Sequence, residues 1–245
     1  MLNILIPLGS HTNFSESAEY PYPKPLVEIG GKPMIQKVIE NLSQISGEKR
    51  FIFILREDDC RRFHLDTTVR LLAGDDAIVI KLQSETKGAV CSALLAVDFI
   101  CNNSPLVIAN GDQLFETDLN ECLRLFRSDK ADAGCLCIDS VHPRWSYVRL
   151  DGDSIVESAE KRPISRNAIA GFYYFSHGKL FVEAAKSSIR KDVNLNGIYY
   201  IAPVLNELVL GSCKLKAIPI SESNYHAFYS PQKIEEYELW RSKIR

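Results

Sequence analysis

The sequence predicts an α/β fold with a mostly parallel, mixed central sheet, and three observations support this. Short apolar runs of strand length alternate four times with segments of helical spacing in the first half of the 245-residue chain. These runs are continuously apolar, which is typical of strands that are buried on both faces. The second half changes to short strands separated by turns, which predicts a smaller antiparallel layer.

The first half is expected to follow a regular order of strand and helix. We expect strands at residues 4–8, 51–55, 77–82, 106–109 and 133–138, and helices at residues 32–45, 59–72, 88–100 and 119–126. In the first helix Ile35, Val38 and Leu42 recur at helical spacing, and Pro33 lies in the first turn, where proline costs least. This half alone therefore predicts a sheet with helices on both faces.

The second half is expected to contain shorter strands before helices return. Strands are expected at residues 146–150, 154–159, 172–175 and 215–220, and helices at residues 179–189, 201–210 and 231–244. Asp151-Gly152-Asp153 is a hairpin signal between two of these strands. Because no repeat, linker or low-complexity segment interrupts the chain, we expect one domain over residues 1–245.

Composition and charge exclude several classes of protein. The net charge is −2 and no strongly basic stretch occurs, so neither nucleic acid nor an acidic membrane is expected as the main partner. No apolar run approaches the roughly 18 to 20 residues of a membrane span, and the N-terminus does not resemble a signal peptide. The seven cysteines show no paired spacing, and Cys135 and Cys137 would share one face of a strand as packing thiols. We therefore expect a cytoplasmic protein.

The loop after the first strand is the first candidate for ligand binding, because ligands of open α/β sheets lie outside the carboxyl ends of the strands. The backbone N–H groups of the loop that begins with Leu8, Gly9, Ser10 and His11 would hold a phosphate chain. Lys24, in a Pro-Lys-Pro-Leu segment, would add a positive charge. An ordinary loop with a surface lysine is the alternative interpretation.

Two further strand ends carry suitable residues. Gln83 offers both donors and acceptors for a base edge, and Lys87 precedes Gly88, which lets a ligand approach the start of a helix closely. Asn110 and Gly111 lead to Asp112, whose carboxylate would hold a magnesium ion together with substrate phosphates. The alternatives are a polar loop before a packing helix in the first case and a simple turn in the second.

These stretches, in this order, resemble the sugar-phosphate nucleotidyltransferases, also called nucleotide-sugar pyrophosphorylases. The matching segments include YPYPKPLVEIGGKPMIQKVIENL, ETKGAVCSALLA, PLVIANGDQ, SAEKRPIS and AGFYYF, and they span nearly the whole chain. Within that family the chain is most similar to a branch found in capsular polysaccharide biosynthesis loci. The resemblance implies a Rossmann-like, three-layer fold of the nucleotidyltransferase or glycosyltransferase-A type, with a nucleotide-binding half at residues 1–140 and an acceptor half at residues 141–245.

The resemblance also implies an activity: a phosphate oxygen of a phosphorylated sugar or polyol attacks the α-phosphorus of a nucleoside triphosphate, and pyrophosphate leaves. It assigns phosphate contact to Lys24 and the magnesium cofactor to Asp112. The implied nucleotide-binding residues are Leu8, Gly9, Ser10, His11, Gln83, Lys87, Gly88, Asn110 and Gly111, and the implied acceptor-binding residues are Arg144, Glu160, Lys161, Gly171, Asn196 and Tyr200. No nucleic acid or membrane span is implied, and homo-oligomer formation stays open.

The sequence departs from the family pattern at two places. The family's Gly-x-Gly-(Ser/Thr)-Arg loop is replaced by the segment from Ser10 to Phe14, so the arginine that stabilises pyrophosphate is missing. Near the C-terminus Ala227 stands where the family often has a second metal aspartate, and the adjacent His226 is either a metal ligand or a packed histidine. Two alternatives to an active enzyme follow: a non-catalytic nucleotide-binding relative that acts in capsule assembly, and a glycosyltransferase that uses Asp151 and Asp153.

Overall fold

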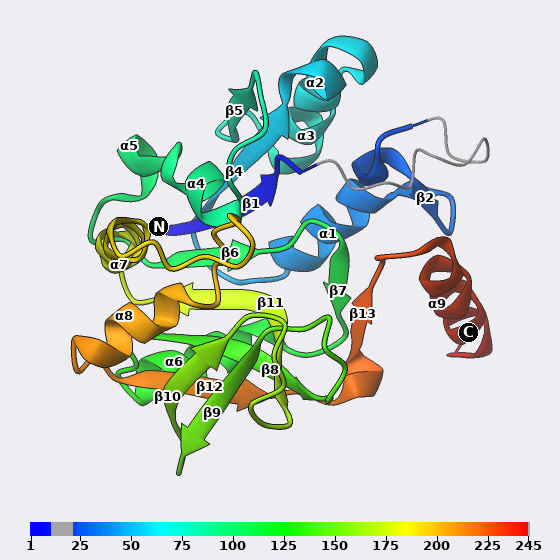
Figure 1. The fold of residues 1–245 in the computed structure, drawn as a ribbon. Coiled ribbons are helices and arrows are strands. Elements are labelled where there is room, and N and C mark those ends of the chain that lie inside the picture. The colour runs from blue at the N-terminus through cyan, green and yellow to red at the C-terminus, as the bar shows by residue number, and fades with distance from the viewer. Residues whose placement is uncertain (11–21, 245) are drawn as a thin grey trace.

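A nine-stranded mixed sheet forms the centre of the protein in the computed structural model, which describes residues 1–10 and 22–244 (Figure 1). The strand order is β5 (Ile78–Leu82), β4 (Lys49–Arg56), β1 (Leu2–Leu8), β6 (Leu106–Ala109), β11 (Asn167–Phe175), β8 (Ala133–Asp139), β12 (Leu215–Pro219), β10 (Ser154–Ala159) and β9 (Tyr147–Asp151). Only β11 and β10 run against the other strands of this sheet. The predicted mostly parallel, mixed α/β sheet is confirmed, and the short antiparallel strands of the second half continue it.

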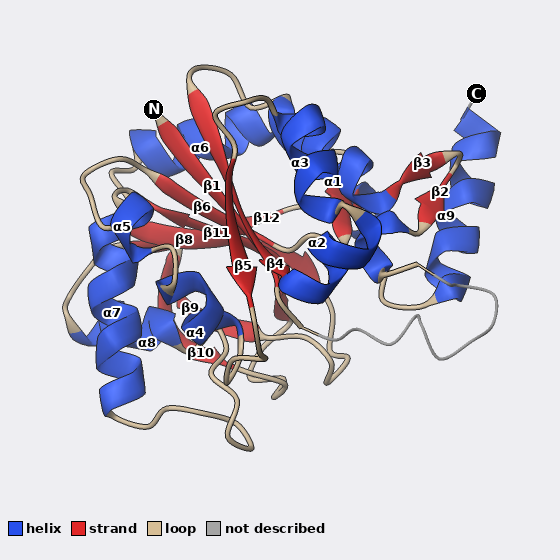
Figure 2. Cartoon of the chain, turned by 90° about the horizontal axis from the view of Figure 1, so that it is seen from above, coloured by secondary structure: helices blue, strands red, loops and turns tan. Residues whose placement is uncertain are grey.

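Helices cover both faces of the sheet (Figure 2). They are α1 (Met34–Ser43), α2 (Glu57–Phe63), α3 (Leu65–Ala73), α4 (Ala89–Leu94), α5 (Val97–Ile100), α6 (Leu119–Ser128), α7 (Gly178–Arg190), α8 (Val204–Leu210) and α9 (Pro231–Ile244). One hydrophobic cluster contains side chains of α1, α3, α6 and α9, and the other contains side chains of α4, α7 and α8. The three layers that the sequence predicts are therefore present.

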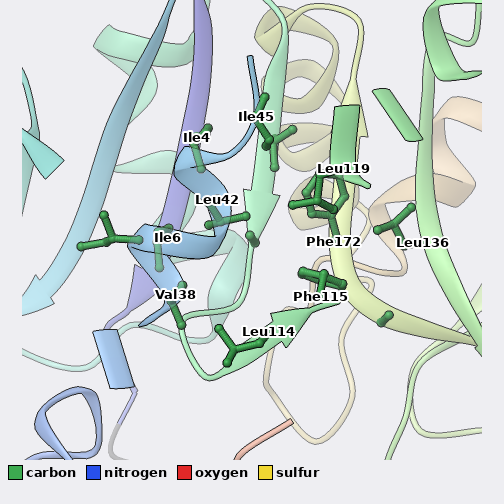
Figure 3. Close-up of a cluster of buried hydrophobic side chains, with 14 of the residues drawn as sticks. Ile4, Ile6, Val38, Leu42, Ile45, Leu114, Phe115, Leu119, Leu136 and Phe172 are labelled. Carbon is green, nitrogen blue, oxygen red and sulfur yellow. The ribbon is translucent and has the colours of Figure 1, made fainter. Parts of the chain in front are cut away.

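The continuous apolar run of β1 serves both clusters. Ile4 and Ile6 belong to the cluster under α1, and Leu5 belongs to the cluster under α4. Figure 3 shows Ile4 and Ile6 beside Val38 and Leu42 of α1. Because successive side chains of a strand point to opposite faces, a strand with helices on both sides needs apolar residues at every position.

Two helix predictions are wrong, because each of the two predicted helices is interrupted in the structure. The helix expected at residues 59–72 is divided into α2 and α3, because His64 adopts a left-handed conformation with φ 53° and donates its N–H to the carbonyl of Cys60. This break lets Leu65 and Val69 pack into the core. The helix expected at residues 88–100 is divided into α4 and α5 at Ala96, whose φ of −87° and ψ of 11° leave the helical range.

Two small strand pairs were not expected. β2 (Glu28–Ile29) pairs with β3 (Lys32–Pro33), and β7 (Gln113–Phe115) pairs with β13 (Tyr225–Ala227). The second pair brings the chain near residue 226 back to the end of β6. Two 3₁₀ turns, η1 (Lys24–Leu26) and η2 (Glu222–Asn224), precede β2 and β13.

The turn between β9 and β10 and the two cysteines of β8 lie where the sequence predicts them. Asp151, Gly152 and Asp153 form the predicted turn between β9 and β10, with Gly152 at φ 57°. Cys135 and Cys137 are both buried on the same face of β8. Within residues 1–10 and 22–244, no helix combines the length and apolar character that crossing a membrane requires.

Candidate active site at the carboxyl edge of the sheet

An ion pair between Lys24 and Asp112 lies at the carboxyl edge of the sheet. Lys24 Nζ is 2.5 Å from Asp112 Oδ2, and the side chains are 7% and 30% exposed. Lys24 is carried by the turn η1, in which Pro23 and Pro25 limit the backbone and Val27 donates its N–H to the carbonyl of Lys24. The residue predicted to contact phosphate and the residue predicted to hold magnesium are therefore in direct contact.

Gly111 allows Asp112 to occupy this position. A Cβ on Gly111 would lie 2.3 Å from Leu8 Cδ2, so any larger residue between the end of β6 and the end of β1 would force the Leu8 side chain to move. On the opposite side Phe228 donates its backbone N–H to the carbonyl of Asp112 at 2.8 Å. This hydrogen bond anchors the backbone of Asp112, whose side chain is partly exposed.

A buried hydrogen-bond network supports the same edge. Gln113 is 2% exposed, its Nε2 donates to the carbonyl of Gly171 at 2.8 Å, and its Oε1 accepts from the Tyr225 hydroxyl at 2.9 Å. The backbone N–H of Asn110 donates to the same Gly171 carbonyl. Burial raises the pKa of Tyr225 well above its usual value, so the phenol stays a neutral donor. This network fixes Gly171, which was predicted to lie near the acceptor, beside Asn110.

The segment that contains Gly88 is joined to the segment that contains Tyr199. Tyr199 donates its N–H to the carbonyl of Lys87 at 2.7 Å, and Val90 donates its N–H to the carbonyl of Tyr199 at 3.1 Å. A Cβ on Gly88 would lie 2.5 Å from that Tyr199 carbonyl. The predicted base-reading segment and the predicted acceptor segment, which includes Asn196 and Tyr200, are therefore neighbours.

The predicted acceptor residues Glu160 and Lys161 have partners of their own. Ser146 donates its hydroxyl to Glu160 Oε2. Burial raises the pKa of the Glu160 carboxyl, while the hydrogen bond from Ser146 acts in the opposite direction. Lys161 Nζ donates to the Tyr200 hydroxyl at 3.1 Å and lies 5.0 Å from the centre of the Tyr200 ring. The sequence predicted Lys161 and Tyr200 separately, and the structure brings them together.

Arg144 and His226 line a separate pocket of about 410 Å³ between the loop after β8, β13 and α9. Arg144 stacks on Tyr229, with 3.3 Å from its guanidinium carbon to the ring centre. The His226 ring lies 4.5 Å from that of Trp240, centre to centre, and its buried Nε2 has no hydrogen-bond partner among the described residues. Burial lowers the pKa of His226 from 6.5 to about 4. His226 therefore has the surroundings of a packed, neutral histidine.

The other predicted nucleotide-binding residues lie at the ends of β1 and β5. Gly9 lies at the end of β1, where a Cβ would meet Leu82 at 2.3 Å, and Ser10 and Gln83 are exposed. His11 lies outside the described residues. In the described ranges, residues 1–10 and 22–244, no group of three or more His, Cys, Asp or Glu side chains is arranged to hold a metal ion.

Sequence reasoning missed the residues that position the site: Gln113, Ser146, Tyr199, Tyr225 and Phe228. Gln113 directly follows Asp112, so a polar residue at the start of an otherwise apolar run was an available signal. The other four act through backbone groups or through partners at least 14 residues away, which no local pattern reveals.

Comparisons with known proteins agree with this geometry. The family model described as nucleotidyl transferase matches residues 20–204. The UTP–glucose-1-phosphate uridylyltransferase AglF of Haloferax volcanii is 28% identical over 160 residues, and the alignment covers 63% of this chain and 63% of that relative. This alignment thus spans less than two thirds of the relative's length.

Solved structures share the fold at lower identity. The nucleoside-diphosphate-sugar pyrophosphorylase from Vibrio cholerae RC9 superimposes with a TM-score of 0.82 at 20% identity and covers 96% of this chain and 99% of that chain. The inositol-1-phosphate CTP transferase from T. maritima gives a TM-score of 0.77 at 17% identity and covers 99% of this chain and 95% of that chain. These structures support the fold, and the family model establishes that the chain belongs to the nucleotidyl transferase family.

Proposed function

We propose that the protein is a nucleotidyltransferase that couples a nucleoside triphosphate to a phosphorylated sugar or polyol and releases pyrophosphate. The contact between Lys24 and Asp112 carries this proposal, because it joins a cation for phosphate oxygens to a carboxylate for a metal ion at one strand edge. Gly111 directly precedes Asp112, and an added Cβ there would lie 2.3 Å from Leu8 Cδ2.

The chemistry requires positioning more than covalent participation by the protein. A phosphate oxygen of the acceptor forms a bond to the α-phosphorus, the bond from that phosphorus to the bridging oxygen breaks, and pyrophosphate leaves with the electron pair. Lys24 would neutralise negative charge that develops on the phosphate oxygens. The backbone at Gly9, Ser10 and Gly88 would orient the triphosphate and its base.

We also propose magnesium as the cofactor. Asp112 is the fitting ligand, because its carboxylate is partly exposed and its backbone is fixed by Gly111 and Phe228. Magnesium is commonly held by one or two carboxylates together with substrate phosphates and waters. When bound, the ion would neutralise part of the negative charge on the triphosphate oxygens. We do not propose His226 as a second ligand, because its ring packs against Trp240.

The acceptor would lie on the side of Glu160, Lys161 and Gly171. Glu160 is held by Ser146 and would accept hydrogen bonds from hydroxyl groups, while Lys161 would meet a phosphate. This pairing suits a small molecule that carries both hydroxyls and a phosphate. A role in surface polysaccharide synthesis and a cytoplasmic location remain parts of the proposal that the sequence resemblance supports.

A non-catalytic, nucleotide-binding relative is the second candidate. The sequence favours it at one place, where the segment from Ser10 to Phe14 lacks the family's glycines and arginine. An arginine at such a position contributes several orders of magnitude to rate in related phosphoryl chemistry. This candidate predicts nucleotide binding without turnover.

Pyrophosphate release separates the two candidates. The protein is mixed with magnesium, each of the five common nucleoside triphosphates, and a panel of sugar phosphates and polyol phosphates. We expect release with at least one pair, and at least a 100-fold lower rate for Asp112→Asn. Asp151→Asn, which changes an exposed carboxylate in the β9–β10 turn, is the control and keeps the wild-type rate. Tight nucleotide binding with no release for any pair would favour the non-catalytic candidate.

A further inference from the structure

The pocket of about 410 Å³ between the loop after β8, β13 and α9 is rich in aromatic side chains. Five aromatic residues line it: Trp145, Tyr225, Tyr229, Tyr237 and Trp240. Tyr225 and Tyr237 are buried, whereas Tyr229 is 38% exposed, so part of this aromatic surface faces solvent. Pockets for small molecules typically have about 300–1,000 Å³, with apolar and aromatic walls and a few polar groups. The pocket thus has the size and the lining of a ligand site, and the proposed reaction does not use it.

Two walls of the pocket are fixed by hydrogen bonds of the protein itself. Tyr147 donates its hydroxyl to the carbonyl of His142 at 2.7 Å, and Trp145 donates its N–H to the same carbonyl at 3.2 Å. On the other side the Tyr225 hydroxyl is bonded to Gln113 at 2.9 Å. The rings of Trp145 and Tyr225 meet edge to face, with their centres 5.8 Å apart. A ligand would therefore meet preformed walls, which lowers the entropic cost of binding.

The charged residues around the pocket balance one another. Two cationic residues, Arg144 and Lys233, and two acidic residues, Glu222 and Glu236, line it. Lys233 also donates a hydrogen bond to Glu236. Burial lowers the pKa of His226 to about 4, so this residue adds no charge at neutral pH. Because the formal charges cancel, the pocket favours an uncharged ligand over a triphosphate or a cation.

Aromatic rings beside donors and acceptors of both charges suit a saccharide. The C–H groups on the face of a sugar ring carry a small positive charge, which the negative face of an aromatic ring attracts. Sugar hydroxyls both donate and accept, so they can bond to the Glu222 carboxylate and to the Arg144 guanidinium. The phosphate of a nucleotide, in contrast, would be repelled by Glu222 and Glu236.

We propose that this pocket is a non-catalytic binding site for a neutral saccharide of one or two sugar units. The rings of Trp145, Tyr229 and Trp240 hold the apolar face of the sugar, and Arg144 and Glu222 bond to its hydroxyls. This inference goes beyond the proposed function and does not depend on it.

Tryptophan fluorescence tests the proposal, because both tryptophans of the chain, Trp145 and Trp240, line the pocket. The full chain is titrated with glucose, galactose, mannose, N-acetylglucosamine, maltose and sucrose. We expect a saturable change with at least one sugar, and at least tenfold weaker binding of that sugar by Arg144→Ala. Arg149→Ala is the matched control, because Arg149 is exposed on β9, where it pairs with Glu157. The control is expected to change the affinity less than twofold.

The variant Glu160→Gln separates the pocket from the proposed acceptor site. We expect this variant to bind the sugar with the wild-type affinity, and a loss of binding would place the sugar at Glu160 and overturn the inference. The inference is also overturned by the absence of a saturable change with every sugar, or by equal affinities of the wild type and Arg144→Ala. If Arg144→Ala does not fold, Glu222→Gln takes its place with the same expected loss. Uridine monophosphate that binds more tightly than every sugar, and whose binding is lost in Arg144→Ala but kept in Glu160→Gln, would show that the ligand is an anion.

Discussion

Replacing Gly171 by alanine tests whether the network around Gln113 holds the active-site edge together. Gly171 has φ 62°, a left-handed conformation that glycine adopts readily. An added Cβ would lie 2.4 Å from Asn110 Nδ2 and 2.5 Å from Gln113 Oε1. Gln113 is almost fully buried, so it has little room to move away, and its bonds to Gly171 and Tyr225 would be strained together.

The expected loss of stability can be added from three contributions. The left-handed conformation costs an alanine about 1 kcal/mol. Overpacking of a filled interior costs about 1–3 kcal/mol, and a buried amide that loses a hydrogen bond costs about 1–3 kcal/mol. We expect Gly171→Ala to lower the free energy of unfolding by about 3–7 kcal/mol, which is a large part of the roughly 5–15 kcal/mol of a typical domain.

Urea denaturation followed by circular dichroism measures this loss. Gly152→Ala is the matched control, because Gly152 has φ 57° in an exposed turn and nothing lies within 4 Å of an added Cβ. The control contains the conformational cost without the collision, so it should lose only about 1 kcal/mol. Equal losses in the two variants would show that the predicted collision with Asn110 and Gln113 does not occur.

Two further predictions concern Asn206 of α8 and His226 of β13. Asn206→Ala should lower stability by about 2–3 kcal/mol in the same urea assay, because Asn206 is bonded to both the N–H and the carbonyl of Ser158; a loss below about 0.5 kcal/mol would refute this. His226, with its pKa lowered to about 4 in the folded state, should make the wild type lose about 2–3 kcal/mol as the pH falls from about 6.5 to about 4, because the unfolded chain takes up the proton first. His226→Phe should remove that part of the pH dependence in denaturation at several pH values, and an unchanged slope would contradict the assignment.

Most of the architecture could be predicted from the sequence, because the apolar runs of β1, β4, β6 and β8 coincide with strands that are buried on both faces. Each of these strands lies between two helical layers, so a continuous apolar run is both necessary and recognisable. The His64 break was not predictable in the same way. A left-handed conformation is uncommon for every residue except glycine, so the presence of His64 alone did not predict the break between α2 and α3.

The part of the candidate site that could be predicted consists of charged residues that follow recognisable strands. Lys24 and Asp112 are 88 positions apart, but each follows a recognisable strand, and the parallel sheet brings the ends of those strands to one edge. Arg144 was placed on the acceptor side by resemblance, whereas its guanidinium stacks on Tyr229 beside α9. That contact depends on the pairing of β7 with β13, for which the sequence gives no periodic signal.

A crystal structure with a non-hydrolysable triphosphate analogue and magnesium tests the central claim most directly. We predict phosphate oxygens within hydrogen-bond distance of Lys24 Nζ, the metal ion on Asp112, and the base beside Gln83 and Gly88. A triphosphate bound in the pocket beside Arg144, with the contact between Lys24 and Asp112 unchanged, would contradict the proposed active site.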